Sequence, residues 1–95
     1  MKKLASILVP VYNEQNSILG VLNKLNEVFN NKYEYEIIVI NDCSTDSTKQ
    51  ILEENSNLYT VLINNNTNLG KGGSVKKGLE LSNGTYIFFQ DADNE

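Results

Sequence analysis

Short apolar runs alternate along this chain with segments whose apolar residues recur at helical spacing. Ile18, Leu22 and Leu25 lie on one face of a helix that polar residues end near position 31. Asn16 or Ser17 is suited to cap its start, and Gly84 to cap the end of a later helix. The pattern predicts strands at residues 5–11, 35–40, 58–63 and 85–89. It also predicts helices at residues 18–29 and 71–81, and between them a short helix that follows a turn at 42–46 and ends near residue 54.

The resulting order is β-α-β-α-β-α-β, and this order determines the expected fold class. Residues 35–40 (YEIIVI) are almost wholly apolar, which is typical of a strand covered on both faces. Regular alternation of strands and helices favours a parallel sheet with helices packed against it. We therefore expect an α/β fold with a Rossmann-like open parallel sheet, formed as a single unit by the 95 residues.

The composition excludes several kinds of functional site. All eight basic residues are Lys, there is no His, and Cys43 is the only cysteine. A Ser-His-Asp triad, a His-containing zinc site and an internal disulfide are excluded. The net charge of -4 argues against a nucleic-acid surface, and no apolar run reaches the ~20 residues of a membrane span. We expect a cytoplasmic location, including the cytoplasmic face of a membrane.

Acidic side chains follow three of the four predicted strands. Ligands bind beyond the carboxyl ends of the strands in open α/β sheets, so these side chains are expected to converge there. Asp91 and Asp93 come directly after the last strand, and two carboxylates at this spacing suit Mg²⁺ or Mn²⁺. The alternative is a solvated acidic segment, because such short patterns are common by chance.

The other candidate residues also have two interpretations each. Asp42 can accept hydrogen bonds from a nucleoside or cap the next helix. Tyr12 and Glu14 can line a base or serve as a half-buried aromatic and an acid in the first turn of a helix. Lys71, in a glycine-rich helix start, can face an anion, although the segment fits no phosphate-loop pattern. The alternative is that the glycines there only allow close packing or a tight turn.

Four segments carry these candidate residues: 9–14 (VPVYNE), 41–46 (NDCSTD), 68–72 (NLGKG) and 90–93 (QDAD). In this order and spacing they resemble the family 2 glycosyltransferases of the GT-A fold. The third and fourth are most similar to the branch that transfers sugars to polyprenyl or dolichol phosphates. The resemblance covers nearly the whole chain.

The resemblance implies a UDP- or GDP-sugar donor, a divalent cation (Mg²⁺ or Mn²⁺) and inverting sugar transfer. It implies that Asp91 and Asp93 form the DxD motif that binds the metal and the diphosphate. It also implies that the base and ribose lie against the first two segments and that Lys71 lies near the base or phosphate. The implied substrate-binding residues are Pro10, Tyr12, Glu14, Asp42, Lys71, Asp91 and Ala92.

The sequence departs from the family pattern in three respects. Asn41 stands where the family commonly has an Asp, and Cys43 where it often has Gly or Asn. No residue matches the family's catalytic base, so no catalytic residue is assigned. Residues 1–95 are therefore expected to be the donor-binding half of a GT-A domain, without the acceptor half and without activity of its own.

One alternative function belongs to a different class. Residues 85–89 (TYIFF) are expected to form an exposed apolar edge, which tends to pair with another chain. The protein would then be a non-catalytic α/β binding or assembly module that self-associates through this strand. Peripheral membrane contact is a further expectation for a longer form. A phosphoacceptor domain is disfavoured, because Asn13-Glu14 replaces the acidic pair that it needs.

Overall fold

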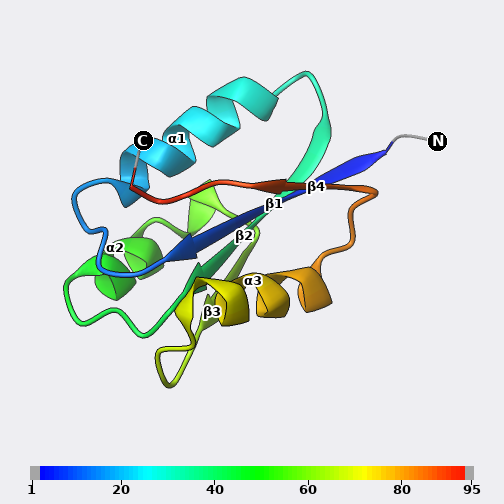
Figure 1. Cartoon of the computed structure of the whole chain (residues 1–95). Helices are drawn as coiled ribbons and strands as arrows, with labels where there is room; N and C mark the ends of the chain where they lie inside the picture. The colour runs from blue at the N-terminus through cyan, green and yellow to red at the C-terminus, as the bar shows by residue number, and fades with distance from the viewer. Residues whose placement is uncertain (1–2, 94–95) are drawn as a thin grey trace.

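The computed structural model describes residues 3–93, which form a parallel sheet covered on both faces by helices (Figure 1). In the described part, no helix is long and apolar enough to cross a membrane. The elements are β1 (Leu4–Val11), α1 (Ile18–Phe29), β2 (Glu34–Asn41), α2 (Thr48–Glu54), the 3-10 helix η1 (Ser56–Leu58), β3 (Val61–Asn64), α3 (Gly70–Leu81) and β4 (Tyr86–Phe89).

The strand order β3-β2-β1-β4 places the two long strands at the centre of the sheet. β1 and β2 pair in parallel along their whole lengths, from Leu4 opposite Glu34 to Val11 opposite Asn41. β3 and β4 pair with the outer edges of β2 and β1, also in parallel. All four strands therefore have their carboxyl ends on one side of the molecule, as the sequence predicts.

Two apolar layers pack on the two faces of the sheet. Alternate strand residues such as Val9 and Val39 point toward α1 and α2, where they meet Leu22 and Leu52. The intervening residues Leu8, Ile38 and Ile40 form the smaller layer under α3. Figure 1 shows α1 and α3 on opposite sides of the sheet. This two-sided burial explains why the central strands are almost continuously apolar.

Two sequence predictions about element boundaries are wrong. The third strand begins at Val61 and not at residue 58, because Ser56–Leu58 form a 3-10 turn in which the amide of Leu58 donates to the carbonyl of Asn55 (3.1 Å). Gly84 does not cap α3, since the helix ends with Ser82 in an extended conformation. Gly84 is needed for another reason: a Cβ there would lie 2.7 Å from the amide nitrogen of Ser6.

A buried carboxylate ties the start of β4 to the centre of the sheet. Glu36 on β2, 7% exposed, accepts hydrogen bonds from the hydroxyl of Ser6 (2.6 Å) and the amide of Asn83 (2.7 Å). The Ser6 oxygen in turn accepts from the amide of Gly84 (2.8 Å). We call Ser6, Glu36, Asn83 and Gly84 the amino-end clamp. It fixes where β4 begins, and thus where the residues after β4 emerge.

Candidate nucleotide-binding site

A shallow pocket of about 260 Å³ lies where β1 and β4 end. Pro10 comes from β1, and Tyr12, 46% exposed, and Glu14 come from the loop that follows it. The other walls are Lys71 from the first turn of α3 and the segment after β4. The lining residues are Pro10, Tyr12, Glu14, Lys71, Asp91, Ala92 and Asp93. The structure thus brings together every candidate residue from the sequence except Asp42.

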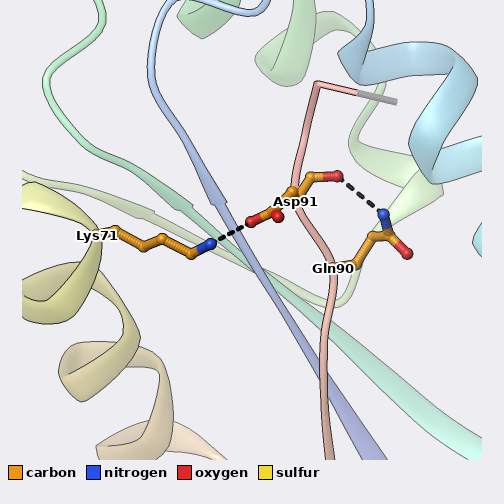
Figure 2. A network of polar contacts seen from close by, with 3 residues as sticks. All are labelled: Lys71, Gln90 and Asp91. Carbon is orange, nitrogen blue, oxygen red and sulfur yellow. Dashed lines mark hydrogen bonds and ion pairs between the residues drawn. The ribbon is translucent and has the colours of Figure 1, made fainter. Parts of the chain in front are cut away.

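An ion pair crosses this pocket. The Lys71 ammonium lies 2.6 Å from Oδ1 of Asp91, and both side chains are more than half exposed. Figure 2 shows Lys71 reaching from α3 to the segment that follows β4, where Gln90 donates to the Asp91 carbonyl (2.9 Å). Because the pair is exposed, water screens it and it stabilises the fold only weakly. A ligand can therefore separate the two charges at small cost.

The segment after β4 alternates between buried and exposed residues. Ala92 is 4% exposed and packs into the apolar layer under α1, while Asp91 and Asp93 are exposed on either side of it. Burial of Ala92 therefore fixes the backbone from which both carboxylates project. Among residues 3–93 no third His, Cys, Asp or Glu completes a three-residue cluster. Two carboxylates on one segment fit the way Mg²⁺ binds through one or two carboxylates plus phosphate oxygens and water.

Asp42 lies outside this pocket and holds the start of α3. Its carboxylate, 4% exposed, accepts hydrogen bonds from the amides of Leu69 (2.7 Å) and Gly70 (2.8 Å) and from Nδ2 of Asn65 (2.9 Å). The first amides of a helix have no partner within the helix, and a negative charge there is favoured by the helix dipole. Asp42 thus caps a helix, as one sequence interpretation had it, but the helix is α3 and not the next one, α2. Its contact with a nucleotide stays a prediction.

These hydrogen bonds set the ionisation of Asp42. Burial alone would raise the pKa of this carboxyl group, but the hydrogen bonds from Leu69, Asn65, Gly70 and Ser74 together hold it below the usual value. The carboxylate therefore stays charged at neutral pH. Two of the amides at the glycine-rich helix start are consequently already occupied by the chain itself, which leaves Lys71 as the group there that faces the pocket.

The two positions that depart from the family pattern have clear local roles. Asn41, 2% exposed, donates from Nδ2 to Oδ1 of Asn64 (2.9 Å) and accepts from the amide of Ser44 (3.3 Å). Cys43 has a φ of 62°, in the left-handed region that Gly and Asn adopt more readily than other residues. The turn after β2 therefore has a backbone conformation that suits Gly or Asn, and Cys43 adopts it in this chain.

Asn13 is one residue at this edge to which the sequence analysis assigns no role. It joins the loop after β1 to the loop after β2, and the amide of Thr45 donates to its Oδ1 (2.7 Å). The available signal was an Asn at a strand end, a residue type that tolerates the left-handed backbone found here (φ 51°).

Comparison with known proteins identifies the class to which this fold and pocket belong. The profile of glycosyl transferase family 2 matches residues 6–95. The chain therefore belongs to glycosyl transferase family 2, as its four sequence segments indicated.

Relatives within the family include enzymes of lipid-linked sugar transfer. The chain is 37% identical over 98 residues to a dolichyl-phosphate beta-glucosyltransferase of Dictyostelium discoideum, covering 93% of this chain and 30% of that protein. It is 36% identical over 94 residues to an undecaprenyl-phosphate 4-deoxy-4-formamido-L-arabinose transferase of Pseudomonas fluorescens, covering 93% and 27%. The chain thus spans less than a third of the length of these relatives.

Solved structures confirm the GT-A fold. Residues 1–349 of Staphylococcus aureus TarS in complex with UDP-GlcNAc superpose with a TM-score of 0.82 at 35% identity, covering 98% of this chain and 27% of that one. The mannosyltransferase PcManGT of Pyrobaculum calidifontis, in complex with GDP-Man and Mn²⁺, gives a TM-score of 0.83 at 24% identity, covering 98% and 28%. The second comparison supports the fold alone.

Proposed function

We propose that this chain binds the nucleotide-diphosphosugar donor of a family 2 glycosyltransferase, with a divalent metal ion, in the pocket between β1, α3 and the segment after β4. The observation that carries the proposal is the gathering of Lys71, Asp91 and Asp93 with Tyr12 and Glu14 in one pocket. Two carboxylates that can hold a cation, and an ammonium group beside an aromatic ring and a third carboxylate, suit a diphosphate joined to a nucleoside. TarS in complex with UDP-GlcNAc, at 35% identity, supports the same class of ligand.

Each wall of the pocket has a separate role in the proposal. Tyr12 packs against the base, and Pro10 and Glu14 complete the nucleoside side. Asp91 and Asp93 hold Mg²⁺ or Mn²⁺, and Lys71 leaves Asp91 for a phosphate oxygen. The bound cation would supply charge neutralisation that makes the nucleoside diphosphate a better leaving group. The ion pair of 2.6 Å places the ammonium at the same carboxylate, so the two cations compete for it.

The reaction of the whole protein is proposed from the family. Inverting transfer moves the sugar from the nucleoside diphosphate to an acceptor hydroxyl or phosphate oxygen. A polyprenyl phosphate or a growing glycan fits the relatives, two of which are named as dolichyl- and undecaprenyl-phosphate transferases. The acceptor, the catalytic base, the cytoplasmic location and contact with a membrane stay predictions.

A thermal-shift titration with UDP or GDP, each with and without Mn²⁺, tests the donor site. We expect the melting temperature to rise with one of these nucleotides, and to rise further with the metal. The double variant Asp91→Asn, Asp93→Asn should lose the metal-dependent part of the rise. Glu80→Gln, which removes an exposed carboxylate on α3 away from the pocket, is the matched control and should respond like the wild type. An unchanged metal response in the double variant would contradict the metal assignment.

A second function is favoured by one further observation. Tyr86, Phe88 and Phe89 on β4 are between 44% and 60% exposed, and within residues 3–93 no strand pairs with the outer edge of β4. An apolar edge strand of this kind can pair with another chain, which suits the assembly module considered above. Light scattering of the purified chain, read together with the thermal-shift titration, distinguishes the two functions. Assembly in light scattering without a nucleotide response in the titration would support the module and contradict the donor site.

A further inference from the structure

The loops that follow β1 and β2 are joined side by side by hydrogen bonds. Between residues 13–15 and 44–48, most of the hydrogen bonds pair a backbone amide of one segment with a side chain of the other. The amide of Asn13 donates to Ser44 Oγ (3.0 Å), the amide of Glu14 to Thr48 Oγ1 (3.1 Å), and the amide of Ser47 to Gln15 Oε1 (3.0 Å). The two loops are therefore expected to move together.

Asn13 makes more of these contacts than any other residue of the two loops. Its Oδ1 accepts from the amides of Thr45 (2.7 Å) and Asp46 (3.3 Å), and its Nδ2 donates to Oγ1 of Thr45 (3.1 Å). The side chain thus takes up the amides of a turn that would otherwise need water as a partner. Its positive φ turns the backbone so that amide and side chain both face the neighbouring loop.

The neighbours of Asn13 explain why the hydrogen bonds between the two loops matter for the pocket. Tyr12 and Glu14, on either side of it, line the pocket, while the side chain of Asn13 is not part of the lining. On the other loop, Asp42 precedes the joined turn and holds the amides of Leu69 and Gly70, directly before Lys71. One continuous set of contacts therefore relates the position of Tyr12 and Glu14 to that of Lys71.

We propose that Asn13 is a positioning residue for the nucleotide: it touches no ligand and acts through Tyr12 and Glu14, whose place relative to α3 it fixes. This inference rests on the proposed donor site. A residue that only stabilises the fold would, when replaced, lower the melting temperature and leave the affinity of the folded protein unchanged. A positioning residue changes that affinity as well, because the pocket walls are no longer held in place.

Asn13→Gly removes the side chain and keeps the backbone freedom that a φ of 51° requires. Asn31→Gly is its matched control, since Asn31 also has a positive φ (66°) but lies beyond the end of α1, outside the pocket. Asn13→Asp keeps the Oδ1 acceptor for two amides and loses the Nδ2 donor. Dissociation constants for UDP and GDP with Mn²⁺ are measured by calorimetry well below each melting temperature, after circular dichroism has shown that each variant is folded.

We expect Asn13→Gly to bind the nucleotide about tenfold more weakly than the wild type, from the loss of two or three hydrogen bonds that order the walls. Asn31→Gly should bind within twofold of the wild type, and Asn13→Asp should recover most of the loss. If Asn13→Gly does not fold, Asn13→Asp carries the test and should bind about two- to threefold more weakly.

Wild-type affinity in the folded Asn13 variants, or equal weakening in Asn31→Gly, would overturn the inference while the donor site stands. Failure of the wild type itself to bind either nucleotide would overturn the proposed function. The two outcomes are distinguishable, because one is measured on the variants and the other on the wild type.

Discussion

Strand β2 presents a buried carboxylate at each end of the sheet, and α3 is held between them. Asp42, just past the carboxyl end of β2, accepts hydrogen bonds from the amides at the start of α3. Glu36, near the amino end of β2, accepts a hydrogen bond from the amide of Asn83, which follows the end of α3. Burial raises the pKa of both groups, and their hydrogen bonds lower it further than burial raises it, so both stay ionised. An ionised, buried carboxylate therefore accepts hydrogen bonds at each end of α3, but the surroundings of the two carboxylates differ.

The surroundings differ in two ways. Asp42 lies at the positive end of the α3 dipole, whereas Glu36 lies near the negative end, where a carboxylate gains nothing from the dipole. At the carboxyl end the close approach of the loops is met by left-handed backbone at Asn13 and Cys43, and at the amino end by a glycine without a side chain. Cys43, at the end that carries the pocket, is neither Gly nor Asn and therefore adopts the left-handed region at a cost, whereas the opposite end is built from tight packing around Gly84.

Replacing Asp42 by Asn should give the largest effect. Both carboxylate oxygens accept from backbone amides, so an Asn must turn its NH₂ group toward Leu69 or Gly70 and lose the favourable charge at the helix start. We expect a loss of about 2–3 kcal/mol in the free energy of unfolding at pH 7, measured by denaturant titration. A loss below about 0.5 kcal/mol would show that these hydrogen bonds contribute little.

The same variant has a defined pH dependence. Because the pKa of Asp42 is lower in the folded chain than in the unfolded one, its contribution is complete above about pH 4 and is lost as the pH falls below that value. The difference between the wild type and Asp42→Asn should therefore narrow in acid. A difference that stays constant down to about pH 2 would assign the effect to something other than the charge.

Gly84→Ala tests the tight packing at the amino end. A Cβ at this position would meet the amide nitrogen of Ser6 at 2.7 Å and the carbonyl of Leu4 at 2.8 Å, both of them backbone atoms that cannot turn away. We expect a loss of about 2 kcal/mol, seen as a melting temperature lower by roughly 10 °C. Gly20→Ala is the control, since a Cβ there meets nothing within 4 Å and should be neutral or stabilising.

Cys43→Asn tests the strain at the carboxyl end. Asn adopts the left-handed region at lower cost than Cys, and the thiol makes only a weak contact with the carbonyl of Asn66 (3.6 Å). We expect the variant to be more stable than the wild type by about 1 kcal/mol in thermal unfolding. An unchanged or lower melting temperature would mean that the turn accommodates Cys43 without strain.

Glu36→Gln should give the smallest effect, which makes it the matched partner of Asp42→Asn. The two short hydrogen bonds, from Ser6 and Asn83, reach the same oxygen, Oε2, so the Gln carbonyl oxygen can accept both. Its NH₂ group then replaces Oε1, which accepts a single long hydrogen bond from Nδ2 of Asn83 (3.4 Å). We expect a loss of about 0.5 kcal/mol by denaturant titration. A loss as large as that of Asp42→Asn would show that charge, and not geometry, governs both ends.

Patterns local in the sequence predicted most of the fold and most of the pocket. Apolar runs and helical spacing predicted the seven main elements, and the rule that ligands bind at strand ends gathered Tyr12, Glu14, Lys71 and Asp91 correctly into one pocket. One of the two interpretations of Asp42 is a cap of the next helix, but its amide partners lie 27 and 28 residues further on, beyond the reach of any local pattern.

The amino-end clamp was missed for a related reason. Glu36 directly precedes the apolar residues 37–40, and an acid at the start of such a buried run is a signal for a buried hydrogen-bonding network. The signal gives no partner, however, because Ser6 and Asn83 are distant in sequence. Glycine is common at the ends of helices, so the sequence favours a cap at Gly84, while the close approach of another strand cannot be seen in one sequence.

The carboxylate of Asp42 also changes how fast the start of α3 exchanges hydrogen with water. The first amides of a helix ordinarily exchange quickly, since they have no partner within the helix. Those of Leu69 and Gly70 are hydrogen-bonded to a buried carboxylate at 2.7 and 2.8 Å. Their protons can exchange only when Asp42 releases them, so two adjacent amides directly before Lys71 report how often this edge of the pocket opens.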